Sequence, residues 1–300
     1  MMPGLTAALA LLIADPLIMG AQQKAPPLPG EAQTDLIHTA ADAAERMTVS
    51  VAVQGGGPYR FLVDTGSQRT VLSTALANRL ALVQGPTVRV VGVAGIHSVA
   101  TARVDEIAFG NQLVAGLTVP LLEDRHMGAD GIIGTDSLQG QRVVIDFVRN
   151  TIAVGSASDA ASTSGYEIVV RARRRSGRLI LTNALIDGVR TDVVIDTGAQ
   201  GTIGNRALQK ASRGKKAGTG SLFSVTGQML AADFEVARLL KIDALQLGNV
   251  LIAYADAPAF AELKLSAKPA ILLGMREMRA FKRVAINFAS RKVSFDLPNR

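Results

Sequence analysis

The chain contains no cysteine, only three histidines and few aromatic side chains. Without cysteine there can be no disulfide, no thiol catalysis and no cysteine-based metal site. The histidines lie far apart and no H-E-x-x-H spacing occurs, so the sequence offers no support for zinc chemistry. A G-x-S-x-G motif is also missing, and with it the nucleophile turn of the common serine hydrolases. We therefore expect neither a metal nor a cofactor.

Long stretches with helical periodicity are scarce, whereas strand-forming residues recur in short runs. This pattern predicts a mostly-β protein. The 300 residues are enough for two compact lobes with separate cores. The apolar content is ordinary and the charge content modest, so we expect most of the chain to fold.

The net charge of +7 has two local sources, residues 171–178 and residues 206–216. Such clusters can bind nucleic acid, anionic lipid or an acidic substrate. Aromatic residues are few and no nucleic-acid-binding motif is present. We therefore interpret the clusters as a solvent-exposed connector and a solvent-exposed loop, and expect no nucleic-acid partner.

The N-terminal 21 residues include the apolar run Leu5–Ala14, which is too short to span a membrane. The run is similar to the apolar region of a signal peptide, and the small residues Gly20 and Ala21 would precede a cleavage point. We predict a signal peptide over residues 1–21, with export to the periplasm or the exterior. If the segment is not a signal, a cytoplasmic location is expected. Residues 22–45 are rich in proline and are predicted to be a flexible segment.

Two short stretches of the chain repeat each other. Residues 61–67 read FLVDTGS, and 132 positions later residues 193–199 read VVIDTGA. Each has the pattern of a buried strand that runs into an Asp-Thr-Gly turn. Burying one ionised carboxylate alone costs more free energy than packing returns. We infer that Asp64 and Asp196 compensate each other at one shared site.

Other segments return in the same order. The apolar-apolar-Gly segment and a later strand recur at offsets of 140 and 141 residues, as Ile132–Gly134 and Leu272–Gly274, and as residues 142–147 and 283–288. A constant order with slowly growing offsets indicates an internal repeat. We predict an N-terminal lobe over residues 46–160 and a C-terminal lobe over residues 161–300, each with a short helix.

Each residue of the repeated turns has a physical role. Gly66 and Gly198 have no Cβ, which allows two backbones to approach closely at a symmetric interface. The short, stiff side chains of Thr65 and Thr197 carry hydroxyl groups that can tie the two loops together. The apolar-apolar-Gly segments are expected to pack beneath these loops.

A further segment, residues 88–101, reads as two strands joined by Gly92, Val93, Ala94 and Gly95. It predicts a hairpin with a tip of small residues, which is a candidate flap over a cleft or an ordinary surface hairpin. Residues 223–228 occupy the corresponding place in the second half. Three other polar residues receive ordinary interpretations: His97 is expected to be exposed to solvent, and Asp130 and Asp136 are interpreted as turn residues.

Together these motifs resemble the aspartic peptidases of the pepsin and retropepsin type. The resemblance rests on Asp64–Ser67, Asp196–Ala199 and the two apolar-apolar-Gly segments, and it extends over roughly residues 46–298. It implies two pseudo-symmetric β-barrel-like lobes with a central cleft and a short helix in each lobe. The segments are short and the flap candidate lacks tyrosine, so the chain is closer to two retroviral-type protomers fused in tandem.

The resemblance implies an aspartic endopeptidase that cleaves a protein or peptide substrate. In such an enzyme Asp64 and Asp196 share one proton and activate a water molecule. A monomer is expected, with pairing of lobes between two chains as the alternative assembly. The alternative function is a non-catalytic peptide-binding module on the same scaffold.

The residue after each Asp-Thr-Gly turn differs between the halves, being Ser67 in the first and Ala199 in the second. In this family a hydroxyl at that place can donate a hydrogen bond to the neighbouring carboxylate and favour its charged form. This asymmetry predicts that Asp64 is the carboxyl group more often ionised.

Overall fold

The computed structural model describes residues 36–38, 40–41, 47–110, 112–156 and 165–298. The predicted signal peptide, most of the predicted flexible segment and the predicted lobe boundary between residues 160 and 161 lie outside these residues. The described part of residues 22–45 holds two strands, β1 (Leu36–His38) and β2 (Ala40–Ala41), which pair with strands of the folded body. Within the described ranges, no helix has the length and apolar character needed to cross a membrane.

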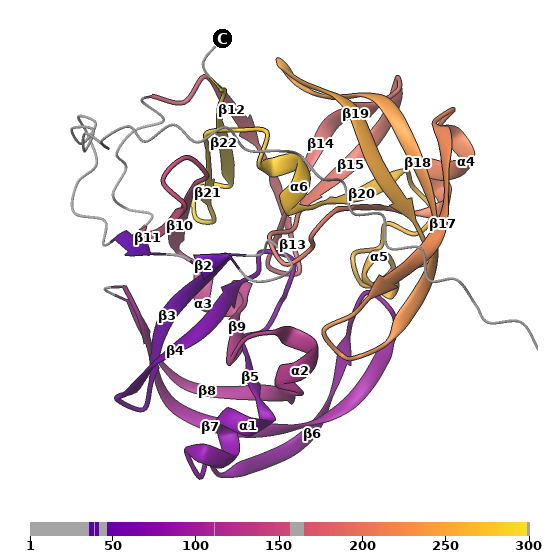
Figure 1. Ribbon diagram of the computed structural model, residues 1–300. Coiled ribbons are helices and arrows are strands. Elements are labelled where there is room, and N and C mark those ends of the chain that lie inside the picture. Colours follow the sequence, from indigo (N-terminus) through magenta and orange to yellow (C-terminus); the bar gives the residue numbers. More distant parts are fainter. Residues whose placement is uncertain (1–35, 39, 42–46, 111, 157–164, 299–300) are drawn as a thin grey trace, which may run out of the picture.

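The first half of the chain forms a sheet of eight strands (Figure 1). In spatial order these are β2, β3 (Met47–Val53), β4 (Gly56–Val63), β9 (Gly131–Ile133), β5 (Val71–Ser73), β8 (Gln112–Leu122), β7 (Ile96–Phe109) and β6 (Gln84–Val91). An additional pairing of β3 with β7 joins strands from different parts of this order, so the sheet curls toward a barrel.

The second half forms an eight-stranded sheet with the same order. Its strands are β13 (Arg173–Arg175), β14 (Arg178–Ile186), β15 (Val189–Ile195), β20 (Ala270–Leu273), β16 (Thr202–Gly204), β19 (Leu245–Tyr254), β18 (Met229–Ile242) and β17 (Lys215–Phe223). The additional pairing of β14 with β18 matches that of β3 with β7. The structure thus confirms a mostly-β fold, and its two eight-stranded sheets share one topology.

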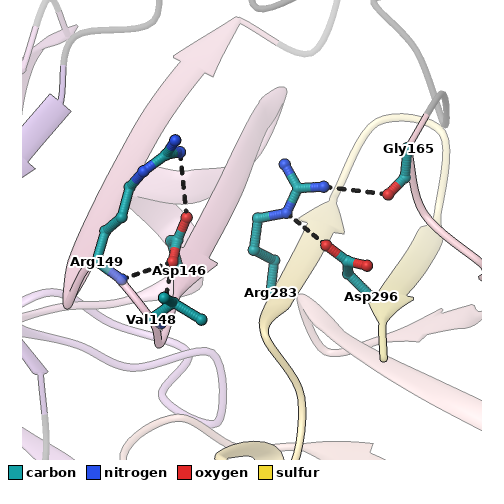
Figure 2. A network of polar contacts seen from close by, with 6 residues as sticks. All are labelled: Asp146, Val148, Arg149, Gly165, Arg283 and Asp296. Carbon is teal, nitrogen blue, oxygen red and sulfur yellow. Dashed lines mark hydrogen bonds and ion pairs between the residues drawn. The ribbon is translucent and has the colours of Figure 1, made fainter. Parts of the chain in front are cut away.

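A third sheet joins the two halves. Its six strands are, in order, β1, β11 (Thr151–Ser156), β10 (Gln141–Asp146), β21 (Arg283–Asn287), β22 (Lys292–Asp296) and β12 (Ile168–Arg171). The repeated strands β10 and β21 pair antiparallel at its centre. Figure 2 shows polar contacts of this sheet: Asp146 accepts the backbone N–H of Arg149 at 2.8 Å, and Arg283 Nε donates to Asp296 at 2.8 Å. These buried charges are paired, as burial requires.

Six short helices lie at the ends of strands in the described part of the chain. They are α1 (Thr74–Arg79), α2 (Asp124–Met127), α3 (Thr135–Leu138), α4 (Arg206–Ala211), α5 (Pro258–Glu262) and α6 (Met275–Met278). The side chain of Ser73 caps α1 by accepting the Leu76 N–H, and Asn205 caps α4 in the same way. Serine and asparagine are among the preferred residues at this position.

The strands that end at the two aspartates are apolar on both faces for a structural reason. In β4, Phe61 and Val63 pack into the main core, whereas Leu62 packs into a separate cluster on the opposite face. In β15 the residue corresponding to Leu62 is Val194, and it packs into its own separate cluster. Because both faces are covered, three consecutive apolar residues anchor each strand immediately before its aspartate.

Candidate active site

The two aspartates follow equivalent strands. Asp64 comes directly after β4, and its N–H donates to the Ile133 carbonyl of β9 at 3.0 Å. Asp196 comes after β15 and donates in the same way to Leu273 of β20, at 3.1 Å. The fold brings the two carboxyl groups to one place, where each lies against the glycine of the opposite Asp-Thr-Gly turn. The sequence interpretation placed both acids at one site, and in the structure they share it.

The two glycines of the turns lie against the carboxyl groups of the opposite lobe. A Cβ built on Gly66 would overlap the carboxyl group of Asp196, and a Cβ built on Gly198 would overlap that of Asp64. Any side chain at these positions would therefore push the two acids apart. Here the requirement for glycine is one of space, since neither residue has a positive φ.

Two buried threonines link the lobes through a reciprocal set of hydrogen bonds. Thr65 N–H donates to Thr197 Oγ1 at 3.0 Å, and Thr197 N–H donates to Thr65 Oγ1 at 3.2 Å. Each hydroxyl then donates to a carbonyl of the other lobe: Thr65 to Ile195 at 2.8 Å, and Thr197 to Val63 at 2.6 Å. This network fixes one Asp-Thr-Gly turn relative to the other.

Backbone groups stabilise each carboxylate. Gly66 and Ser67 N–H groups donate to Asp64 Oδ1 at 2.7 and 2.8 Å. Gly198 and Ala199 N–H groups donate to Asp196 Oδ1 at 3.0 and 3.1 Å. The local environment of the two acids is thus nearly symmetric at the backbone level.

The expected role of the Ser67 hydroxyl is wrong. Ser67 Oγ donates to the Arg69 carbonyl at 2.8 Å and not to a carboxylate. Its backbone N–H already occupies the Asp64 oxygen, and the alanine of the other half supplies an equivalent N–H. The Ser67/Ala199 difference therefore provides no hydroxyl hydrogen bond that would favour ionisation of Asp64.

Burial is the main influence on the acidity of the pair. It raises the pKa of Asp64 and, together with the charge of Asp64, raises the pKa of Asp196 to about 7. The hydrogen bonds from the backbone and the positive charge of Arg178 oppose both shifts. Since a hydrogen bond from Asp196 also lowers the pKa of Asp64, the two groups titrate as a pair.

Both carboxyl groups face one cavity of about 890 Å³ that is lined by residues of both lobes. Its walls include apolar side chains such as Val71 and Ile132 from the first lobe and Ile203 and Leu272 from the second. This size suits several side chains of an extended peptide. In the described part of the chain, no group of three or more His, Asp or Glu side chains is placed to hold a metal ion.

The candidate flap lies at the tip of the β6–β7 hairpin, where Gly92 N–H donates to the Gly95 carbonyl at 2.8 Å. Gly92 and Val93 line the cavity, and Ala94 and Gly95 complete the tip. The tip meets its counterpart from the β17–β18 hairpin: a Cβ built on Gly92 would lie 2.7 Å from Ser224 Oγ. Figure 1 shows the two long hairpins converging near α5.

The two hairpins cross over the cavity and contact the opposite lobes. Val93 of the first packs against an apolar cluster of the second lobe that contains Val194. Val225 of the second packs against the cluster of the first lobe that contains Leu62. The sequence analysis assigned only one candidate flap, whereas in the structure residues of two hairpins line the cavity. The matching position of residues 223–228 was the available signal for the second.

His97 lies next to the tip of the first hairpin and is half-buried, which corrects the expectation that it is solvent-exposed. The antiparallel register pairs it with Val90. Its Nε2 is buried without a hydrogen-bond partner, close to the flap tip where Gln228 of the second hairpin lies. The contact between the hairpins is what covers this ring.

The interpretation of Asp136 as only a turn residue is also wrong. Its Oδ1 accepts hydrogen bonds from both the N–H and the hydroxyl of Thr70, at 2.8 and 2.7 Å, beneath the first active-site loop. In the second lobe Glu277 accepts the hydroxyl of Thr202 at 2.6 Å. The repeat was hidden because the second lobe uses a longer acid one position further along. Asp130, by contrast, accepts the Arg60 N–H at 2.9 Å and stays at the edge of the lobe.

One residue of the basic segment 171–178 is not the solvent-exposed connector that we expected. Arg178 begins β14, is buried with 8% of its surface exposed, and donates from Nε to the Gly66 carbonyl. Its charge acts on both aspartates. Arg174 also contacts the first lobe, donating to Gln139 at 2.8 Å. Charge clustering alone could not separate the buried Arg178 from exposed arginines such as Arg173.

Two similar β lobes that join paired Asp-Thr-Gly turns at a covered cleft define an acid-protease fold. Residues 49–137 match a family model described as aspartyl protease, which confirms the resemblance to an aspartic peptidase of the retropepsin type. The match lies within the first lobe, and the second lobe repeats its strand order. A comparison with curated proteins found no match to this chain.

Proposed function

We propose that the chain is a single-chain aspartic endopeptidase in which Asp64 and Asp196 activate a water molecule. The family match supports a peptidase in general terms, with a protein or peptide as substrate. The observation that carries the finer proposal is the position of two carboxyl groups, the buried Asp196 and the half-buried Asp64, each against the glycine of the opposite turn and both on one cavity.

The proposed reaction uses one proton shared by the pair. The ionised carboxylate takes a proton from a water molecule, and the oxygen of that water attacks the peptide carbonyl carbon. At the same time the protonated carboxyl group donates its proton toward the carbonyl oxygen. The tetrahedral intermediate then breaks its C–N bond as the nitrogen receives a proton, releasing a carboxylic acid and an amine. The chemistry needs no covalent intermediate.

Within this proposal the two carboxyl groups hold one proton between them. Burial raises the pKa of both Asp64 and Asp196, and the charge of Asp64 raises that of Asp196 further, so the pair retains a proton where a free aspartate is ionised. Arg178, with its charge near both acids, limits how far burial raises either pKa.

The test is a pair of isosteric substitutions, Asp64→Asn and Asp196→Asn, assayed on a peptide library at several pH values. Each alone is expected to abolish cleavage while circular dichroism shows the same fold as the parent. If either variant keeps comparable activity, the shared-proton mechanism is wrong. A parent protein that binds peptides but cleaves none would favour the non-catalytic binding module.

The same two variants test the proposed monomer. Both acids come from one chain, so mixing Asp64→Asn with Asp196→Asn is expected to restore no activity. Recovery of cleavage on mixing would mean that lobes pair between chains, and gel filtration would then show a dimer.

A further inference from the structure

The cavity that holds the two aspartates is lined by an excess of positive charge. Four of the side chains on its lining are guanidinium groups: Arg69, Arg89, Arg178 and Arg276. The acids on the same lining are Asp64, Asp196 and Glu262. With one proton shared, the aspartate pair carries a single negative charge. A cavity with this balance attracts ligands that carry negative charge.

Arg178 is the arginine closest to the proposed chemistry. It is more than nine-tenths buried, and its Nε is engaged by the Gly66 carbonyl within the first Asp-Thr-Gly turn. Its Nη1 is also buried but has no hydrogen-bond partner among the described residues. A buried N–H of a charged group without an acceptor is costly, so this guanidinium has capacity for one more oxygen atom.

Two other arginines occupy equivalent corners of the cavity rim. Arg69 lies five residues after Asp64, and Gly201 lies five residues after Asp196. The guanidinium group of Arg276 lies against Gly201, 3.5 Å from a Cβ built there. Both rim arginines are exposed, so their effect on a ligand is steering rather than tight binding.

We propose that the cleft selects peptides with Asp or Glu close to the scissile bond, and that Arg178 is the specificity-determining residue that binds this side chain. The inference rests on the proposed function and adds the substrate class. A carboxylate supplies the oxygen acceptor that Nη1 lacks, in a charge-assisted hydrogen bond. The apolar walls of the cavity accept the neighbouring side chains of the peptide. The favoured substrate therefore has one acidic residue flanked by apolar residues.

The test uses matched peptides that differ only by Glu, Gln or Lys at one position near the cleaved bond. The parent enzyme is expected to show kcat/KM at least about tenfold higher for Glu than for Gln. Arg178→Gln is expected to bring this ratio close to one, and Arg178→Lys to retain part of it. Each variant is measured at its own optimum pH, because Arg178 also affects the two aspartates.

Arg173→Gln is the matched control, since it removes one positive charge from the same β13–β14 hairpin at a side chain that does not line the cavity. It is expected to keep the Glu-to-Gln ratio of the parent. If Arg178→Gln lowers kcat/KM for all peptides equally and leaves the ratio unchanged, Arg178 only positions the Gly66 loop and the inference is wrong. An equal loss of the ratio in Arg173→Gln would also overturn it.

Failure of the substrate class can be separated from failure of the proposed chemistry. Binding of the Glu and Gln peptides to Asp196→Asn is measured by calorimetry. Tighter binding of the Glu peptide, lost on adding Arg178→Gln, supports acid recognition even if the parent cleaves nothing. Cleavage of many peptides without preference for an acid would leave the peptidase proposal standing and overturn this one.

Discussion

Replacing Thr197 by valine tests whether the threonine network holds the two lobes together. Valine has nearly the shape of threonine but lacks the hydroxyl group. The change removes the acceptor of the Thr65 N–H and the donor to the Val63 carbonyl, and both of these bonds are buried. No water can replace them at a side chain that is 4% exposed.

The magnitude follows from two buried backbone groups that lose their partner. Each such group costs about 1–3 kcal/mol, so we expect Thr197→Val to destabilise the protein by about 2–6 kcal/mol. Thr197→Ser keeps the hydroxyl and removes one methyl group, for which about 1 kcal/mol is expected. Thr65→Val should resemble Thr197→Val, because the network is reciprocal.

The measurement is urea unfolding followed by fluorescence of the tyrosines and by circular dichroism. With a slope of about 3 kcal/mol/M, the expected loss moves the midpoint down by roughly 0.7–2 M. The double valine variant should lose less than the sum of the singles, since both remove parts of one network. Valine and serine variants of equal stability would show that these hydrogen bonds do not hold the lobes together.

Two further predictions concern the acids and the hairpins. The folded state keeps a proton on Asp196 up to about pH 7, whereas the unfolded chain releases it near pH 3.8. The free energy of unfolding should therefore fall as pH rises through this window. Asp196→Asn should remove most of that fall, as measured by urea midpoints from pH 4 to 8. Val225→Ser removes an apolar contact between the second hairpin and the first lobe. It should raise KM several-fold with only a small change in Tm. An unchanged KM would argue against a role of the second hairpin in covering the cleft.

Much of this arrangement could be predicted from local patterns. An apolar strand that ends in Asp-Thr-Gly is a rare pattern, and its return 132 residues later left few topologies open. The caps Ser73 and Asn205 were also readable, because capping depends on residues three positions apart. These features share one property: their causes lie within a few residues of each other or in a repeat.

The features that were missed depend on contacts between distant segments. Arg178 looked like one more charge in a basic run, and only the fold brings it to Gly66, 112 residues earlier in the chain. Asp136 and Glu277 escaped detection because equivalent hydrogen bonds are made by acids of different length at shifted positions. The second hairpin has little sequence likeness to the first, since its tip is built from other small and polar residues.

Covalent linkage of the two lobes explains why these differences can persist. In a symmetric homodimer any change near the aspartates occurs twice, so both acids keep the same surroundings. Here the second lobe sends Arg178 to the turn of the first, while Ser67 and Ala199 are free to differ. Among the described residues, this asymmetry places the guanidinium group of Arg178 beside the first Asp-Thr-Gly turn. Within the proposed function, we expect such a cleft to favour one direction of the bound peptide, which a cleft with exact twofold symmetry does not enforce.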